Sequence, residues 1–139
     1  MKFYFPHSIS LRIRYSETDK MGFCYYGNYP AFLELARVEA LRSLGVIYAE
    51  LEEQGMLLPV KSLSIDYKKP LRYDELIRVE SILTQVTSCT LQFEYTITGE
   101  DNQLRTRAST TLVFTDSISL RPLKVPDQIM QLILPYEVR

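Results

Sequence analysis

The residues best suited to chemistry lie in the segment 15–29, which reads Tyr-Ser-Glu-Thr-Asp-Lys-Met-Gly-Phe-Cys-Tyr-Tyr-Gly-Asn-Tyr. A carboxylate, Asp19, precedes a glycine turn at Gly22. An aromatic pair ending at Tyr26 follows, and then a helix start at Asn28. The free N–H groups in the first turn of a helix carry partial positive charge. An acid beside that charge suits attack on a carbonyl, with the carboxylate as nucleophile or general base and an amide polarising the oxygen.

Asp19 is not the only acid near this turn. Glu17 lies two residues earlier, and a strand that continued through Glu17 would place both side chains on one face. Aspartate is also favoured in turns and caps, which is the simpler interpretation of Asp19 from local sequence alone. Glu34 and Glu39 are further acids on the following helix, where a solvated or salt-bridged face is expected. The spacing to Gly22 favours Asp19.

The chain lacks most of the residues that other common catalytic mechanisms require. His7 is the only histidine, which argues against Ser-His-Asp and Cys-His mechanisms. Cys24 and Cys89 are far apart and lack a CxxC spacing, so we predict no metal site and a reduced, cytoplasmic protein. The motif contains no base that could activate Cys24 as a nucleophile. We therefore expect Cys24 to be a small, buried, apolar residue.

Composition sets the remaining limits. The chain has 139 residues, of which 46% are hydrophobic and 24% charged, as in an ordinary globular protein, and we predict one domain over 1–139. A formal net charge of −1 gives no general attraction to nucleic acid. No apolar run approaches the roughly 20 residues that span a bilayer. The N-terminus lacks the features of a secretory signal.

Apolar periodicity predicts one long helix over residues 28–44. Apolar residues recur there at helical spacing, Asn28 suits the N-cap, and Gly45 suits the C-terminal stop. Leu35 and Val38 widen the apolar face, so more than half of the helix is expected to be buried. The charged residues assigned to the remaining surface are Glu34, Arg37, Glu39 and Arg42.

Strands are expected before and after this helix. Residues 8–15 alternate between apolar and polar side chains, as in a half-buried strand. After a short helix at 46–54, strand-like patterns continue to residue 116, and Pro126 opens a last short helix. The order lacks βαβ alternation, which favours an antiparallel sheet with one face to cover. We therefore predict an α+β fold in which a curled antiparallel sheet of about five strands wraps around one long central helix.

The chain resembles the 4-hydroxybenzoyl-CoA thioesterase family, including its short-chain acyl-CoA thioesterase members. The residues that carry the resemblance are Asp19-x-x-Gly22-x-x-x-Tyr26-x-x-Tyr29, Phe32, Ala36-Arg37-x-Glu39, Tyr67-x-x-Pro70-Leu71 and the strand from Ala108 to Phe114. The likeness spans nearly the whole chain and implies the hotdog fold. Histidines that many members carry at positions 23 or 26 are absent here, which leaves the acyl group open.

The resemblance implies an activity and a catalytic pair. In that family, the acid at the position of Asp19 is catalytic, and the backbone N–H at the position of Tyr26 polarises the thioester carbonyl. It implies an acyl-CoA thioesterase without metal or cofactor, since coenzyme A is part of the substrate. The acyl group is expected to be small, aliphatic or aromatic. The family also implies a homodimer or homotetramer with the active site between two subunits.

Coenzyme A ends in phosphates, so a pocket for it is expected to present cations. Lys68, Lys69 and Arg72 surround a proline and are the candidates. The remaining candidate substrate-binding residues are Gly22, Tyr25 and Gly27. Two alternatives stay open. One is a non-catalytic module on the same fold that binds acyl-CoA or lipid, and the other is a thioesterase acting on acyl carrier protein.

Overall fold

Five antiparallel strands form a sheet in the order β1-β4-β5-β6-β3, in a computed structural model that describes residues 1–139. The strands are β1 (Lys2–Arg12), β3 (Val60–Tyr67), β4 (Leu76–Val86), β5 (Thr90–Thr98) and β6 (Leu104–Val113). Two short strands, β2 (Met56–Leu57) and β7 (Thr115–Asp116), pair with each other outside this sheet. The strands β1 and β3 therefore form its two edges.

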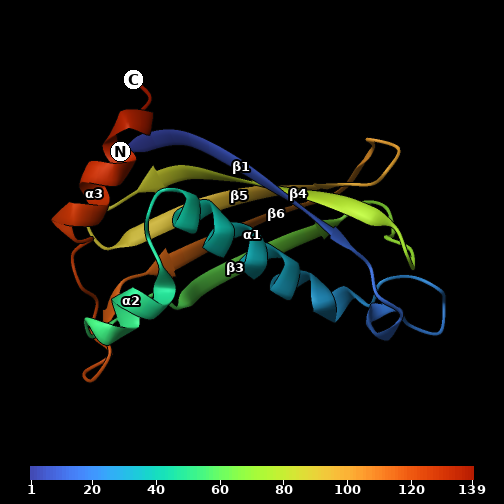
Figure 1. Cartoon of the computed structure of the whole chain (residues 1–139), viewed down its shortest axis with the longest axis horizontal. Helices are drawn as coiled ribbons and strands as arrows, with labels where there is room; N and C mark the ends of the chain where they lie inside the picture. Colours follow the sequence, from blue (N-terminus) through green and yellow to red (C-terminus); the bar gives the residue numbers. More distant parts are fainter.

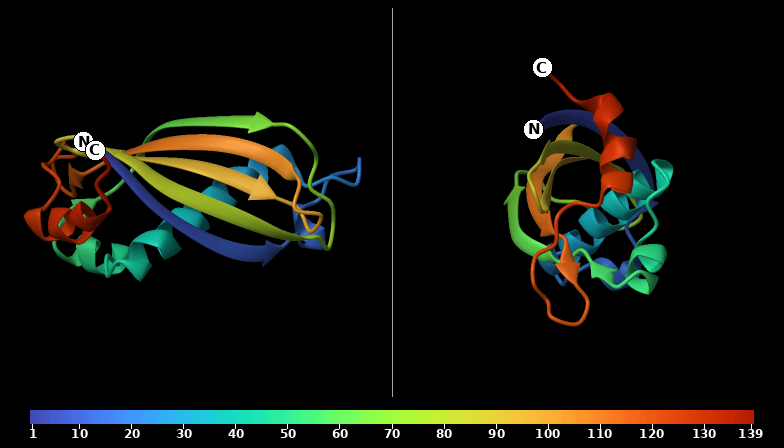
Figure 2. Two further views of the ribbon diagram at one scale, coloured as in Figure 1. Left: turned by 90° about the horizontal axis from the view of Figure 1, so that it is seen from above. Right: turned by 90° about the vertical axis from the view of Figure 1, so that its left-hand side faces the viewer.

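The helix α1 (Tyr29–Ser43) lies against one face of the sheet (Figure 1), and the sheet curves around it (Figure 2). Alternate residues of β5 point toward the helix, and Phe93 and Ile97 among them are fully buried. Phe32, Leu33 and Ala36 of α1 are buried against this face. The predicted α+β fold, a curled antiparallel sheet around one long helix, is confirmed.

The first strand is longer at its start than the alternation over 8–15 predicts. It begins at Lys2, because Phe3 and Phe5 continue the inward-facing row and are buried. It ends at Arg12 and is followed by a 3-10 turn, η1 (Tyr15–Glu17). Glu17 and Asp19 consequently do not lie on one strand face.

The start of α1 differs from the predicted cap. Asn28 has helical backbone angles, φ −82° and ψ −18°, and makes no capping hydrogen bond with its side chain. A 3-10 turn, η2 (Tyr26–Asn28), leads directly into the helix instead. The Asn28 Nδ2 group donates to the Glu17 C=O at 2.8 Å. At the other end Gly45 acts as predicted: with φ +96°, its N–H donates to the Arg42 C=O at 2.9 Å.

Two predictions for the faces of α1 are wrong. Leu35 is exposed, whereas Arg37 is only 6% exposed. Arg37 follows the buried Leu33 by four residues and therefore lies on the same side of the helix. Its Nη2 is 4.0 Å from the Glu34 Oε2, and its Nε has no hydrogen-bond partner.

The edge strand β3 is less covered than its alternating pattern predicts. Leu63 lies opposite Thr110 and Tyr67 opposite Thr106, and both threonines are buried. Leu63 and Tyr67 thus belong to the inward face, yet they are 44% and 43% exposed. The sequence pattern identifies the face correctly, but the position at the sheet edge leaves that face open.

The remaining helices close the ends of the molecule. The helix α2 (Tyr48–Glu53) is shorter than the predicted 46–54, and α3 (Asp127–Ile133) follows Pro126 as predicted. After the last 3-10 turn, η3 (Leu134–Tyr136), the Val138 N–H donates to the Lys2 C=O at 2.9 Å, so the two termini lie together. In length and apolarity, every helix falls short of a membrane span.

Candidate active site

Asp19 opens a tight turn at 19–22. Its C=O accepts the Gly22 N–H at 3.0 Å, and its own N–H donates to the Phe23 C=O at 2.8 Å. Gly22 has φ +84°, a conformation that favours glycine. The Asp19 Oδ1 accepts the N–H groups of Met21 (2.9 Å) and Phe23 (3.3 Å). One carboxylate oxygen therefore supports the turn, while Oδ2 forms no hydrogen bond or ion pair.

Glu17, the rival acid, is occupied differently. Its Oε1 accepts the Arg14 N–H at 2.7 Å, and its Oε2 is 3.3 Å from the Arg14 Nη2. These contacts form a capping box around η1. Both oxygens of Glu17 are thus engaged in local structure, whereas one oxygen of Asp19 is free.

The turn η2 presents the positive end of α1 beside the Asp19 loop. The Tyr25 N–H and the Asn28 Nδ2 both donate to the Glu17 C=O, each at 2.8 Å. The Tyr25 C=O accepts the Asn28 N–H at 3.0 Å. None of the hydrogen bonds in the loops and caps uses the N–H of Tyr26 or Gly27. These two N–H groups are therefore available to an acceptor from outside the helix.

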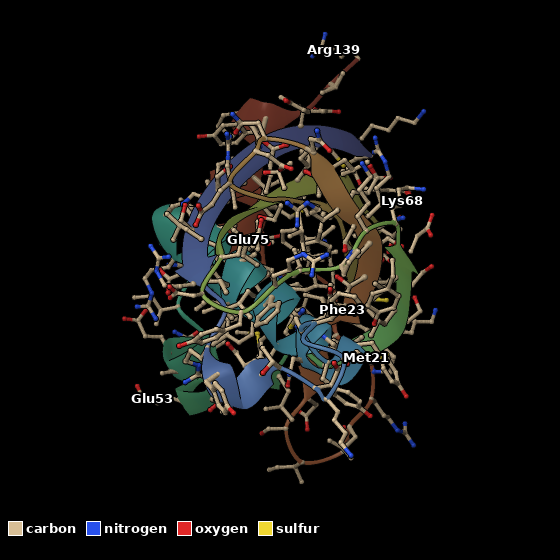
Figure 3. All side chains as sticks on the ribbon, turned by 90° about the vertical axis from the view of Figure 1, so that its right-hand side faces the viewer. Met21, Phe23, Glu53, Lys68, Glu75 and Arg139 are labelled. Carbon is tan, nitrogen blue, oxygen red and sulfur yellow. The ribbon has the colours of Figure 1, made fainter.

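A cavity of about 300 Å³ brings four of the predicted site residues together. They are Asp19, Tyr26, Lys68 and Lys69. The other lining residues are Met21, Phe23, Cys24, Tyr29, Tyr67 and Pro70. Figure 3 looks onto this end of the molecule, with Met21 and Phe23 on the loop before α1 and Lys68 just beyond the end of β3.

Three predicted substrate-binding residues lie beside the cavity and not in its wall. Gly22 shapes the turn that holds Asp19. Tyr25 is exposed, with its ring centroid 4.8 Å from that of Tyr26. Gly27 lies against the Tyr25 ring, where an added Cβ would approach the Cε2 atom to 2.6 Å. Gly22 and Gly27 therefore shape the loop around Asp19 and Tyr26, and the binding role of all three residues stays a prediction.

Two of the three predicted cations, Lys68 and Lys69, line the cavity and have exposed partners. The Lys68 Nζ is 2.8 Å from the Asp66 Oδ2, and the Lys69 Nζ donates to the Gln103 Oε1 at 3.1 Å. The Arg72 guanidinium lies over the Phe23 ring, 5.1 Å from its centroid, and is outside the cavity wall. Exposed contacts of this kind are weak and exchange readily.

The sequence did not single out Tyr67 as a site residue. Its hydroxyl donates to the Tyr26 C=O at 2.9 Å, and its ring centroid is 4.7 Å from that of Tyr29. The alternation of β3 places Tyr67 on the inward face, which was the available signal. The hydrogen bond joins residues 41 positions apart, and no local pattern indicates it. Met21, Phe23 and Pro70 were likewise not proposed as lining residues.

Cys24 also lines the cavity, but its thiol is poorly suited to act as a nucleophile. Burial, reinforced by the negative charge of Glu17, raises its pKa to about 11. A protonated thiol is a weak nucleophile. Burial similarly raises the pKa of Tyr29, also in the cavity wall, to about 12. Cys24 is buried, in line with its expected role as a small apolar residue.

Comparisons with known proteins extend over most of the chain. Residues 13–133 match the sequence profile of the Thioesterase-like superfamily. The acyl-CoA thioesterase YbgC of Haemophilus influenzae is 32% identical over 123 residues, which cover 88% of this chain and 90% of YbgC. YneP of Bacillus subtilis is 32% identical over 114 residues, 82% of this chain and 83% of YneP. The crystal structure of a DHNA-CoA thioesterase from Staphylococcus aureus superposes with a TM-score of 0.88 and 31% identity, covering 94% of this chain and 91% of that one.

Proposed function

We propose that this chain, which belongs to the Thioesterase-like superfamily, hydrolyses acyl-CoA thioesters to the free acid and coenzyme A, with Asp19 as the working acid. Its curled sheet around α1 is the hotdog fold of such thioesterases. Relatives named acyl-CoA thioesterase and DHNA-CoA thioesterase support the reaction. The observation that carries the choice of acid is the cavity in which Asp19, Tyr26 and two lysines meet.

The proposed chemistry uses the free oxygen of Asp19. A thioester carbonyl is electrophilic and its thiolate leaves readily, so a positioned carboxylate and an oxyanion donor suffice. The Met21 and Phe23 N–H groups hold Oδ1, which orients Oδ2 for one of two roles. Oδ2 either attacks the carbonyl carbon to give a mixed anhydride, or takes a proton from an attacking water. In the first route the coenzyme A thiolate leaves as the anhydride forms, and water then hydrolyses the anhydride to the free acid and regenerates Asp19. In the second route the water adds to the carbonyl carbon and the thiolate leaves, which gives the free acid directly.

The proposed oxyanion donor is the Tyr26 N–H. It lies at the positive end of α1, where no backbone acceptor in the loops and caps uses it. The Tyr25 C=O of the same peptide accepts the Asn28 N–H, which strengthens the N–H as a donor. A donor fixed in place before the reaction stabilises the charge that develops on the carbonyl oxygen.

The walls of the cavity suggest which substrates it accepts. Tyr26, Tyr29 and Tyr67 give it aromatic surfaces, and Phe23 adds another. Such walls suit a small aromatic or short aliphatic acyl group. Lys68 and Lys69 are the proposed contacts for the phosphates of coenzyme A, because both line the cavity and their present contacts are exposed and therefore weak.

Assembly and location complete the proposal. We expect a homodimer or homotetramer, as the family resemblance implies. Cys24 and Cys89 are unpaired thiols, which supports a reducing compartment such as the cytoplasm.

The test is thiol release from a panel of acetyl-, butanoyl-, hexanoyl-, benzoyl- and 4-hydroxybenzoyl-CoA. Wild type is expected to hydrolyse members of the panel, and Asp19→Asn to lose at least ~10²-fold in kcat, the lower range for a positioned acid or base. Glu17→Gln is the matched control, because Glu17 is engaged by Arg14 outside the cavity. It is expected to stay close to wild-type activity.

Each contrary result points to a specific alternative. Equal rates for wild type and Asp19→Asn would remove Asp19 from the mechanism. Binding of the panel by wild type without turnover would favour the acyl-CoA or lipid-binding module. A higher kcat/KM for the same acyl group on acyl carrier protein would assign the carrier as the natural donor.

A further inference from the structure

Tyr67, the last residue of β3, ties the sheet to the turn that presents the proposed oxyanion donor. Its hydroxyl donates a hydrogen bond to the Tyr26 C=O at 2.9 Å. We infer that Tyr67 is a positioning residue for thioester hydrolysis, because this bond fixes the Tyr26 main chain relative to the cavity. The inference rests on the proposed function, in which the Tyr26 N–H receives the developing oxyanion.

The other anchors of η2 lead to α1 and to the loop that carries Asp19. The Tyr26 C=O also accepts the Tyr29 N–H at the start of α1. The Tyr25 N–H and the Asn28 side chain both end on the Glu17 C=O, in the loop that also carries Asp19. They hold the donor turn to the acid loop but not to the sheet. Among side-chain hydrogen bonds to η2, the bond from Tyr67 is the one that comes from β3. Its loss would leave the turn attached to the acid loop and to α1, but without its hydrogen bond to β3.

Contacts with two other aromatic rings hold the Tyr67 ring in the position from which its hydroxyl donates to the Tyr26 C=O. The ring packs edge-on against Tyr29, with centroids 4.7 Å apart and planes at 76°. It also meets the Tyr26 ring edge-on, at 6.2 Å and 86°. Tyr29 is buried and begins α1, so the platform under Tyr67 is fixed. A tyrosine hydroxyl is protonated at neutral pH at its ordinary pKa, and burial raises the pKa of Tyr67 further.

The size of the expected effect follows from the geometry of oxyanion donors. Removing such a donor outright costs about 10²–10³-fold in kcat. Tyr67→Phe keeps the proposed oxyanion donor, the Tyr26 N–H, and keeps the aromatic ring. It removes only the hydrogen bond from the Tyr67 hydroxyl to the Tyr26 C=O. A displacement of well under ~1 Å is expected, with a loss in kcat of about 10-fold. KM is expected to stay within about twofold of wild type, because the cavity wall keeps its aromatic surface.

The experiment compares Tyr67→Phe with wild type on the acyl-CoA panel, with Tyr73→Phe as control. Tyr73 is exposed, lies outside the cavity and packs against Tyr15 with ring centroids 5.6 Å apart. A second readout is the infrared stretch of benzoyl-CoA carrying ¹³C at its carbonyl. Bound to Asp19→Asn, this stretch is expected to lie below its value in solution. In Asp19→Asn/Tyr67→Phe it is expected to return toward that value.

The outcomes separate this inference from the proposed function. Loss of kcat in Tyr67→Phe at constant KM, with the infrared shift reduced and Tyr73→Phe unchanged, supports the inference. If Asp19→Asn is inactive while Tyr67→Phe matches wild type in kcat and infrared shift, the positioning role is wrong and the thioesterase stands. A raised KM at constant kcat assigns Tyr67 to substrate binding and also overturns the inference. If wild type hydrolyses no member of the panel, the proposed function fails and the inference with it.

Discussion

At the scale of single residues, Asp19 has a structural role in its turn that is compatible with the proposed catalytic role, although its sequence context presents the two as alternatives. Aspartate in a turn is usually structural, and Oδ1 does accept two backbone N–H groups there. The same bonds fix the plane of the carboxylate and leave Oδ2 without a hydrogen-bond partner, on a residue that lines the cavity. A turn aspartate and a proposed catalytic aspartate are therefore compatible, because the two oxygens do different work.

A pair of glycine variants tests whether the turn positions Asp19. Gly22 and Gly45 have similar backbone angles, φ +84° and +96°, and a Cβ at either would meet nothing within 4 Å. Gly22→Ala and Gly45→Ala are each expected to lower the free energy of unfolding by about 1–2 kcal/mol, the cost of this conformation for an L residue. Only Gly22→Ala is expected to lower kcat, because only that turn carries Asp19. Urea unfolding and panel kinetics measure the two effects.

The Gly45→Ala variant controls for stability alone. If both variants lose equal stability and both keep wild-type kcat, the turn does not position the acid. If both lose kcat alike, the loss follows stability and not the geometry of the site.

Site residues could be predicted from the sequence where they lie close together along the chain. Asp19 and Tyr26 belong to one motif, and Lys68 and Lys69 to one loop, so spacing alone could nominate them. Tyr67 was recognised only as part of a family pattern, because its hydrogen bond reaches a distant segment. The burial of Arg37 was missed for a related reason, since charge alone assigned it to the surface.

At the scale of elements, a part-buried ion pair holds the loop 68–75 that carries both cavity lysines. The Arg105 guanidinium contacts the Glu75 carboxylate through two bonds, of 2.8 and 3.0 Å. Its Nη1 also donates to the Pro70 C=O at 2.9 Å. The side chains of Arg105 and Glu75 are only 11% and 13% exposed. The pair thus connects β6 to the loop at one side of the cavity.

Removing one partner of this pair is expected to be costly. Glu75→Ala removes two charge-assisted bonds from the part-buried Arg105 guanidinium, and we expect a loss of about 1.5–3 kcal/mol in the free energy of unfolding. The matched control is Glu39→Ala, which breaks the half-exposed Glu39–Arg42 pair on α1, 3.6 Å apart. That change is expected to cost no more than about 0.5 kcal/mol. Urea titrations of both variants measure the difference.

A small effect of Glu75→Ala would have a definite meaning. Asp101 Oδ1 lies 3.2 Å from the Arg105 Nη2 and is the remaining carboxylate partner. A loss below about 1 kcal/mol, the value typical of an exposed pair, would show that Asp101 alone compensates the guanidinium.

The periodicity of apolar residues predicted the helices and strands better than it predicted which strands are neighbours and how exposed each one is. It identified α1 and the antiparallel strands, because a spacing of 3.6 or 2 residues records which side of an element is apolar. It does not record which strands are neighbours. The pattern of β3 resembles that of a covered strand, yet β3 is an edge, so Leu63 and Tyr67 remain partly exposed. Sheet order depends on contacts between distant segments, and the sequence pattern does not contain them.

At the scale of the whole molecule, the two edges of the sheet differ. The β1 edge carries Pro6, which has no N–H to donate, and Phe3 at its start is bridged to Glu137 near the C-terminus. The β3 edge has no such protection and exposes Val60, Leu63 and Tyr67. An unprotected edge with apolar side chains is suited to pairing with another chain. We therefore expect the proposed homodimer to form through β3.

A lysine on each edge strand tests this expectation. Leu63→Lys places a charge on the inward face of β3, where a paired strand would have to bury it. Tyr4→Lys places the same charge on β1, at an exposed position of the other edge. In sedimentation at micromolar concentration, wild type and Tyr4→Lys are expected to remain dimers or larger. Leu63→Lys is expected to shift toward monomer.

The same variants connect assembly to catalysis. Tyr67 ends the strand that pairs in the proposed dimer, and its hydroxyl holds the Tyr26 main chain. Loss of the pairing should therefore loosen the donor turn, so kcat of Leu63→Lys is expected to fall while its circular dichroism stays native. A wild-type monomer with full activity would contradict both the dimer and a shared site. A Leu63→Lys monomer with wild-type kcat would contradict only the link between assembly and catalysis, because each subunit would then hold a complete site.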